Sequence, residues 1–199
     1  LFQICDMMRN KERYQSLDAA IPSGLLLYGM PGIGKTMMAE ALIAESGRPA
    51  LMLRRNKPSK DFMADISQTF DEALKQAPSI VFMDDLDKFS PNDRDREVFM
   101  TVQAGLDQVR EKDVFVLATA NLLTGIPLSL LRAGRFDRQI KVTPPSDAQA
   151  EAIFRHYLKG KRLDEEVNQN DLIKLMHGRT CADIKTLLNE AAVYAAYQR

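Results

Sequence analysis

The chain has 199 residues, enough for one sizeable α/β domain with a small appendage. Lysine and arginine together number 27, as do aspartate and glutamate, so no overall charge favours nucleic acid or a membrane surface, although a local basic groove stays open. The two cysteines, Cys5 and Cys181, are too few for a disulfide framework or a cysteine-only zinc site, and we expect a reducing, cytosol-facing compartment.

No apolar run approaches the length of a transmembrane helix, and the first residues lack the layout of a signal peptide. Because the chain begins at Leu1 rather than Met, we expect it to be a fragment, with any membrane anchor or second domain outside it. Residues 1–17 are apolar at Leu1, Ile4, Met7 and Met8 and then charged, which predicts the end of a helix whose start has been cut away.

An apolar strand, residues 25–28, runs into a glycine-spaced loop that ends in Lys35 and Thr36. The glycine spacing is that of the Walker A pattern, in which backbone N–H groups curl around phosphates, the lysine reaches the β and γ oxygens and the hydroxyl binds Mg²⁺. Residues 37–44 are apolar at helical spacing, so the amino-terminal end of a helix would face the anion. The sequence therefore predicts a nucleotide-phosphate site formed by Gly29, Met30, Pro31, Gly32, Ile33, Gly34, Lys35, Thr36 and Met37.

Residues 50–53 predict a short buried strand, which a basic turn follows, residues 54–59. Ser59 could cap the helix after this turn, whose apolar residues recur at helical intervals: Phe62, Ile66, Phe70 and Leu74. A basic turn of this kind is usually a solvated surface, and contact with nucleic acid is the alternative.

Residues 79–83 form a continuous apolar run that ends in Asp84 and Asp85. Such a run predicts a strand buried on both faces of a parallel sheet, whose carboxyl end would bring both acids beside the phosphate loop. In a P-loop enzyme the first acid holds Mg²⁺ and the second handles the attacking water, whereas two solvated acids opening a turn are the alternative. Residues 114–120 predict another buried strand, which delivers Asn121 to the same edge, where it could orient a water or simply make a turn.

Between these two strands, a polar turn at residues 90–93 precedes a helix that should face the core around residues 98–106. Farther on, Arg132, Arg135 and Arg138 lie within seven positions and, on local grounds, could be a solvated surface. A strand is predicted over residues 139–142. Beyond it the chain turns helical, with helical periodicity over residues 148–158, 172–177 and 181–198.

The order of these motifs resembles the AAA family of ring-forming ATPases, and within it the FtsH-type proteases and their classical AAA relatives, over nearly the whole chain. Residues 29–36 match Walker A, residues 80–85 match Walker B, Asn121 sits at sensor 1, and residues 130–138 look like the second region of homology. His177-Gly178 and Ala182-Asp183-Ile184 resemble the signature of the lid's final helices. The resemblance implies an α/β P-loop NTPase core, with a parallel sheet between helices, over residues 1–144, followed by a small α-helical lid over residues 145–199.

The family implies binding and Mg²⁺-dependent hydrolysis of ATP in a ring, expected to be a hexamer, which remodels or unfolds polypeptide and could belong to an FtsH-like ATP-dependent protease. Carried over by position, catalytic roles fall to Lys35, Asp85, Asn121, Arg135 and Arg138, and the metal ligands are Thr36 and Asp84. The two arginines would be fingers that complete the neighbouring subunit's site. Nucleic acid is not an expected partner, and membrane contact would come only through segments outside this chain.

Departures from the family pattern favour a second interpretation, a nucleotide-gated assembly switch with slow hydrolysis and no threading. Family members usually have Asp-Glu where this chain has Asp84-Asp85, and the segment that would hold an aromatic pore loop, residues 53–66, is short. Phe62 is the nearest aromatic residue there, and we expect it to be part of the core because it aligns with Ile66 and Phe70.

The predicted lid also departs from the family, with Tyr157 where a histidine is common and Cys181 where a glycine is. His156 and His177 are the only histidines, and neither belongs to an H-E-x-x-H motif. We therefore expect an ATPase with no protease site within this chain.

Overall fold

The structure, a computed structural model, describes residues 1–19, 21–90, 96–161, 168–176 and 178–198. The chain divides into two compact units. The first consists of Leu1–Gly29 and Lys35–Lys141 and contains the sheet, and the second consists of Met30–Gly34 and Val142–Arg199 and contains the last helices.

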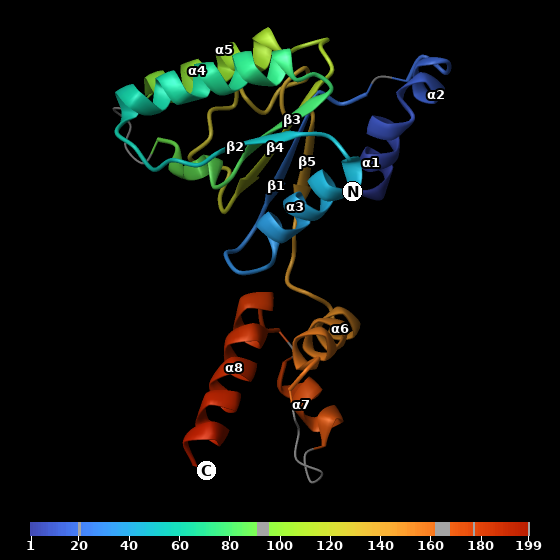
Figure 1. The fold of residues 1–199 in the computed structure, drawn as a ribbon, viewed down its shortest axis with the longest axis vertical. Helices are drawn as coiled ribbons and strands as arrows, with labels where there is room; N and C mark the ends of the chain where they lie inside the picture. The colour runs from blue at the N-terminus through green and yellow to red at the C-terminus, as the bar shows by residue number, and fades with distance from the viewer. Residues whose placement is uncertain (20, 91–95, 162–167, 177, 199) are drawn as a thin grey trace. The chain divides into compact units, whose positions relative to one another are not determined.

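A five-stranded parallel sheet with the strand order β2-β3-β4-β1-β5 forms the centre of the first unit (Figure 1). Its strands are β1 (Gly24–Tyr28), β2 (Ala50–Leu53), β3 (Ser79–Met83), β4 (Val114–Ala120) and β5 (Arg138–Lys141). β3 and β4 are buried along their whole length, as continuous apolar runs in a sheet covered on both faces should be. The predicted α/β class with a parallel sheet is confirmed.

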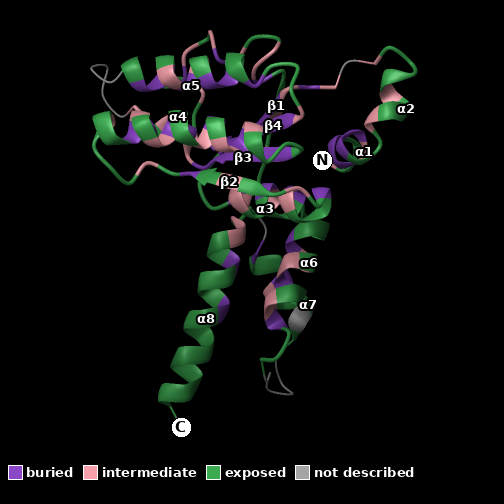
Figure 2. Ribbon diagram, turned by 45° about the horizontal axis from the view of Figure 1, so that its top comes forward, coloured by how far each residue is buried: buried purple, intermediate pink, exposed green. Residues whose placement is uncertain are grey.

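Helices cover both faces of this sheet (Figure 2). α4 (Ser59–Lys75) and α5 (Arg96–Gln108) pack on one face, and α3 (Lys35–Ser46) packs on the other, with α1 (Phe2–Arg9) against it. The core under α4 and α5 includes Phe62, Phe70 and Phe89. A Cβ on Gly105 of α5 would lie 2.1 Å from the ring of Phe70, so glycine is what allows these two helices to approach so closely.

The amino-terminal segment forms two helices rather than the single one that the sequence predicts. α1 ends at Arg9 and α2 (Lys11–Gln15) begins two residues later, because Asn10 has a non-helical backbone with φ −117° and ψ 43°. The Asn10 side chain donates a hydrogen bond of 2.7 Å to Asp6, which holds the break in place. α1 buries its predicted apolar residues, Ile4, Met7 and Met8.

The second unit contains α6 (Asp147–Leu158), α7 (Gln169–Leu175) and α8 (Cys181–Tyr197). Ser146 and Thr180 are the N-caps of α6 and α8, and each forms a capping box, which satisfies two of the free N–H groups at the helix start. Its small core is built from all three helices and includes Phe154, Ile173 and Ile184. His177 of the lid signature and residues 91–93 of the predicted polar turn lie outside the described residues.

In the parts of the chain that the structure describes, no helix combines the length and apolar character needed to cross a membrane. Cys5 and Cys181 are both free thiols.

Candidate functional site

The loop between β1 and α3, where the sequence predicts phosphate binding, contains glycines with positive φ. Gly32 and Gly34 have φ values of 79° and 94°, a region that glycine enters without strain. A Cβ on Gly32 would lie 3.0 Å from the Cβ of Ala182 and 3.1 Å from the hydroxyl of Thr180, so a side chain is also excluded by contact. Within the predicted set, the side chains of Met30 and Met37 are exposed.

The tip of this loop, Met30–Gly34, belongs to the helical unit, where it meets the first turn of α8. The N–H of Ala182 donates to the carbonyl of Gly32 at 3.0 Å, and the Cys181 thiol donates to the carbonyl of Ile33 at 3.5 Å. Burial raises the pKa of Cys181, so this group is a thiol at neutral pH. Two residues singled out in the predicted lid, Cys181 and Ala182, therefore contact the loop directly.

Lys35 begins α3, and its side chain is buried although it carries a charge. Its ammonium donates to the carbonyl of Gly29 and to Oδ1 of Asn121, both at 2.8 Å. Burial lowers the pKa of Lys35, and the neighbouring carboxylates of Asp85, Asp87 and Asp84 oppose this shift. The predicted phosphate lysine thus lies between the end of β1 and the end of β4.

Asp84 directly follows β3, and only 2% of its side chain is exposed. Its Oδ1 accepts from the hydroxyls of Thr36, at 3.0 Å, and Thr119, at 2.7 Å, while its Oδ2 forms an ion pair with the guanidinium of Arg54. Burial acts to raise the pKa of Asp84, but the hydrogen bonds from Arg54, Thr119 and Thr36 outweigh it, and the pKa is lowered. Asp84 is therefore a buried, ionised carboxylate beside the predicted hydroxyl ligand.

Asp85 has a left-handed backbone, with φ 58°, which turns the chain away from the sheet. Its N–H donates to Thr119 at 2.9 Å, and its Oδ2 is paired with Lys88 of η1 (Leu86–Lys88) at 2.7 Å. The amide of Asn121 approaches Oδ1 of Asp85 at 3.5 Å. Asp85, Asn121 and Lys35 are thus brought together at the carboxyl ends of the strands.

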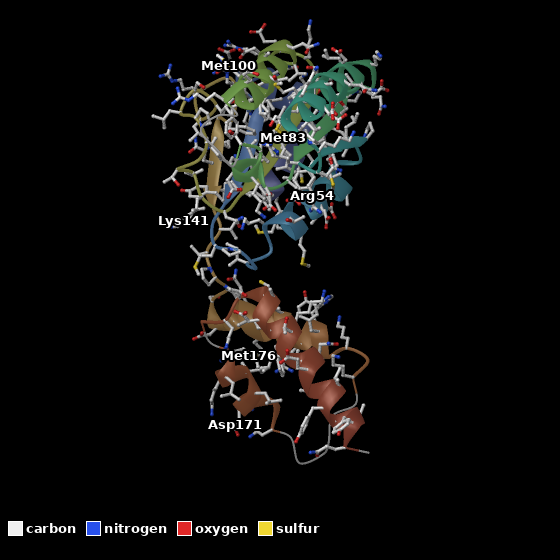
Figure 3. All side chains as sticks on the ribbon, turned by 90° about the vertical axis from the view of Figure 1, so that its left-hand side faces the viewer. Arg54, Met83, Met100, Lys141, Asp171 and Met176 are labelled. Atoms are coloured by element: carbon white, nitrogen blue, oxygen red, sulfur yellow. The ribbon has the colours of Figure 1, made fainter. Side chains whose placement is uncertain are left out.

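Three groups of this site were not singled out from the sequence: Arg54 as the partner of Asp84, Thr119 and Lys88. The first two follow from strand register, because Leu53 pairs with Met83 and Met83 pairs with Ala118. The residues that come next along β2, β3 and β4 are Arg54, Asp84 and Thr119, which therefore lie side by side at one edge of the sheet. Figure 3 labels Arg54 and Met83 in this part of the molecule. Knowledge of the strand order would have revealed the contact.

The basic turn after β2 is largely exposed to solvent, as the sequence predicts, and each of its cations is also paired with a group of the chain itself. Arg54 pairs with Asp84, Arg55 donates to the carbonyl of Phe89 and to the Ser59 hydroxyl, and Lys57 pairs with Asp65 at 2.8 Å. Ser59 is also not the predicted cap: it is the first residue of α4, with Pro58 in the N-cap position. These pairings speak against a basic patch for nucleic acid.

Arg135 and Arg138 lie in different surroundings. Arg135 makes two hydrogen bonds of 2.9 Å to the carboxylate of Asp107 on α5 and also donates to the carbonyl of Ser129. These bonds lower the pKa of Asp107. Arg138 is exposed, and it begins β5 opposite Leu25 in the register of β1.

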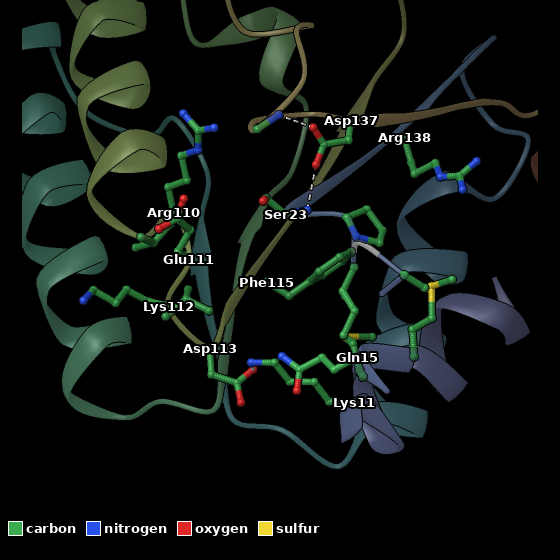
Figure 4. Close-up of a pocket in the computed structure, with 18 of the residues that line it drawn as sticks. Lys11, Gln15, Ser23, Arg110, Glu111, Lys112, Asp113, Phe115, Asp137 and Arg138 are labelled. Carbon is green, nitrogen blue, oxygen red and sulfur yellow. Dashed lines mark hydrogen bonds and ion pairs between the residues drawn. The ribbon is translucent and has the colours of Figure 1, made fainter. Parts of the chain in front are cut away.

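Arg138 lines a pocket of about 610 Å³ where β1, β4 and β5 begin (Figure 4). Asp137 ties this region together by accepting from the N–H of Ser23 at 2.7 Å. Because the strands are parallel, their beginnings and their ends lie at opposite edges of the sheet. The structure therefore does not bring Arg138 to the edge where Lys35 and Asn121 of the same chain meet.

Phe62 is buried, with 1% of its surface exposed, and packs edge to face on Phe89 at 4.9 Å between ring centroids. The prediction that this aromatic residue belongs to the core is confirmed.

Residues 25–144 match the family model described as "ATPase family associated with various cellular activities (AAA)". The chain is 35% identical over 210 residues to ATP-dependent zinc metalloprotease FtsH 2 of Symbiobacterium thermophilum. This alignment covers 98% of this chain and 36% of the relative. It is 35% identical over 209 residues to ATP-dependent zinc metalloprotease FtsH of Acidothermus cellulolyticus, an alignment that covers 98% of this chain and 31% of the relative. It is 33% identical over 218 residues to ATP-dependent zinc metalloprotease FtsH 1 of Methylacidiphilum infernorum, and that alignment covers 100% of this chain and 34% of the relative. The chain thus spans about a third of the length of these relatives.

Proposed function

This chain belongs to the AAA family and is an ATPase module of that family; we propose that it binds ATP with Mg²⁺ and hydrolyses it within a ring of subunits, with six as the expected number. The observation that carries the proposal is the meeting of Lys35, Asn121, Thr36 and Asp84 at the carboxyl ends of the strands. In open α/β sheets that edge is where ligands bind. We assign residues 1–144 to the core and residues 145–199 to the lid.

The donors around Asp84 suit Mg²⁺, which prefers oxygen ligands and is usually held by one or two carboxylates together with waters and phosphates. The Asp84 carboxylate and the Thr36 hydroxyl are 3.0 Å apart, so both can face one ion. We assign these two residues as its protein ligands. When bound, the metal would neutralise charge on the β and γ phosphates.

The other residues of the edge supply positive charge and position a water. The N–H groups of loop residues 29–34 and the first turn of α3, with Met37, would surround the phosphates, and Lys35 would exchange Gly29 and Asn121 for phosphate oxygens. Asp85 would polarise the attacking water. Asn121, whose amide lies 3.5 Å from Oδ1 of Asp85, would help to place that water.

We assign Arg138 as the finger that acts on the neighbouring subunit's nucleotide, since it is exposed and lies at the far end of the strands from its own Lys35. Arg135 is engaged with Asp107, so we assign it the positioning of this loop. A supplied arginine can raise the rate of phosphoryl transfer about 10³- to 10⁵-fold, so the isolated subunit should be nearly inactive.

The relatives named above are ATP-dependent proteases, and we propose that this module drives remodelling or unfolding of polypeptide within a longer protein of the same kind. Two free thiols support a reducing, cytosol-facing location. Any membrane contact would be made by segments outside this chain. The paired cations of the turn after β2 give no support to a nucleic-acid partner.

One observation favours a second candidate function, a nucleotide-gated assembly switch with slow hydrolysis and no threading. Phe62, the nearest aromatic residue to the expected pore loop, is packed on Phe89 inside the domain and cannot grip a polypeptide in that position. Asp85, which is shorter than the usual glutamate, is consistent with slow turnover.

The test is ATP affinity, measured with a fluorescent analogue, beside phosphate release with Mg²⁺ or with EDTA. Lys35→Ala should weaken binding about 10- to 100-fold, the loss expected for one or two charge-assisted bonds, and Asp84→Asn should abolish the response to Mg²⁺. Lys60→Ala, which removes an exposed lysine from α4, is the matched control and should behave as the parent. Parent-like binding and release in both site variants would contradict the proposal.

A further inference from the structure

We propose that the guanidinium of Arg54 occupies the place of the metal ion on the carboxylate of Asp84, so that Mg²⁺ can bind only after Arg54 has left Asp84. This inference rests on the proposed function, because it takes Asp84 as the ligand of the metal. It adds a residue that controls when the metal binds.

Both oxygens of Asp84 are already occupied by groups of the chain. Oδ1 accepts from two hydroxyls, those of Thr36 and Thr119, and Oδ2 is paired with the guanidinium of Arg54. A hydroxyl can turn its proton away and offer a lone pair to a metal, because it is both donor and acceptor. A guanidinium has donors only, so Arg54 has to move before Oδ2 can face another cation.

The two partners differ in their freedom to move. Asp84 is 2% exposed at the end of β3, whereas 59% of the Arg54 side chain is exposed. β2, which Arg54 follows, is the outermost strand on its side of the sheet. Arg54 can therefore swing into solvent while the carboxylate stays fixed, and we identify it as the moving partner.

Charge indicates what drives this movement. Three carboxylates, those of Asp84, Asp85 and Asp87, meet three cations at this edge, those of Arg54, Lys88 and Lys35. A divalent ion that entered alone would have to displace the guanidinium from Oδ2 of Asp84 and would leave this cation at short range without its anion. Phosphates that arrive with the metal would offer Arg54 another anion, so metal and nucleotide should bind together rather than one after the other.

The experiment is titration of the folded chain with Mn²⁺, a substitute for Mg²⁺ whose unbound form gives an EPR signal, in the absence and presence of ADP. Without ADP, Arg54→Gln should bind Mn²⁺ at least tenfold more tightly than the parent does. ADP should raise the Mn²⁺ affinity of both chains, but by a smaller factor in Arg54→Gln than in the parent. Arg54→Lys, which keeps the charge, should bind Mn²⁺ as weakly as the parent. Lys57→Gln is the matched control, since it removes one cation from the same turn but frees Asp65 instead.

Thermal unfolding supplies a readout that does not depend on turnover. In EDTA, Arg54→Gln should melt at a lower temperature than the parent because its buried Asp84 lacks a counterion. Added Mg²⁺ should raise the melting temperature of Arg54→Gln by more than it raises that of Lys57→Gln. Equal Mn²⁺ affinity in the parent, Arg54→Gln and Lys57→Gln would overturn the role of Arg54 and leave the metal site standing. No saturable Mn²⁺ binding by any of these chains, with or without ADP, would overturn the metal site and the role of Arg54 together.

Discussion

Arg135 donates two hydrogen bonds of 2.9 Å to Asp107 of α5, from Nε and from Nη2 to the two carboxylate oxygens. One of the two arginines that resemble trans-acting fingers is thus engaged within its own chain. Its partner in the motif, Arg138, is exposed at the start of β5. The two arginines should therefore have separable roles.

The first prediction concerns the free energy of unfolding. Arg135→Ala and Asp107→Ala should each destabilise the chain, and a double-mutant cycle should give a coupling of about 0.5 to 1 kcal/mol, because Asp107 is half exposed and water screens the pair. Arg138→Ala should unfold in urea like the parent. A coupling of zero would show that the Arg135–Asp107 contact does not hold the loop in solution.

The second prediction is that Phe62 supports the fold and does not contact a substrate. Phe62→Ala should lower the free energy of unfolding by about 3 to 5 kcal/mol, because it removes a buried ring that packs on Phe89. Phe2→Ala makes the same chemical change at a residue that is 91% exposed and should leave stability unchanged. A Phe62→Ala chain with parent-like melting but no substrate processing would assign this aromatic residue to a pore loop.

The sequence was sufficient where local pattern determines structure. β3 and β4 were predicted because their apolar runs are continuous, and the loop between β1 and α3 was predicted because its glycines and Lys35 have a fixed spacing. The burial of Phe62 in the core was predicted because its helical spacing matches Ile66 and Phe70. The break at Asn10 was missed because a single asparagine within a charged stretch is a weak turn signal.

Contacts between distant segments could not be predicted from the sequence alone. Arg54 meets Asp84 only because β2 lies next to β3 in the sheet, and Arg135 meets Asp107 only because α5 lies beside the loop before β5. Thr119 is an ordinary strand residue until the register of β4 sets it beside Asp84. Such pairings depend on strand order and helix placement, which motif spacing does not contain.

The third prediction concerns the dependence of stability on pH. The pKa of Asp84 is lower in the folded chain than its unfolded value of about 3.9, so its contribution to stability is complete above that value and is lost as the pH falls through the folded pKa. In metal-free buffer the parent should therefore lose stability below about pH 4 more steeply than Asp84→Asn does. Urea denaturation at a series of pH values measures this, and parallel curves for the two chains would contradict it.

The fourth prediction concerns Asp85, whose carboxylate is held by Lys88 at 2.7 Å. Aspartate is one methylene shorter than glutamate, which sets the carboxylate back by about 1 Å, and a misplacement of that size can cost about 10²-fold in rate. Asp85→Glu should therefore raise kcat in the assembled protein, while Asp85→Asn should lower it further. ATP affinity should be nearly unchanged in both, because this residue acts on the water rather than on the phosphates.

Steady-state phosphate release measured beside ATP affinity separates the possible outcomes for Asp85. A Glu variant no faster than the parent would mean that the site, including Lys88, is built around the shorter acid. An Asn variant as fast as the parent would show that Asp85 does not handle the water, and would favour the slow assembly switch.

The central claim is that this module hydrolyses ATP at a site that two subunits share, with Lys35 from one and Arg138 from the next. The most direct measurement mixes Lys35→Ala chains with Arg138→Ala chains, each inactive alone, and follows phosphate release across mixing ratios. Turnover should appear in the mixtures, because some interfaces then join an intact phosphate loop to an intact arginine. If the two chains are shown to co-assemble and no mixture exceeds either chain alone, Arg138 does not act across the interface and the shared site is wrong.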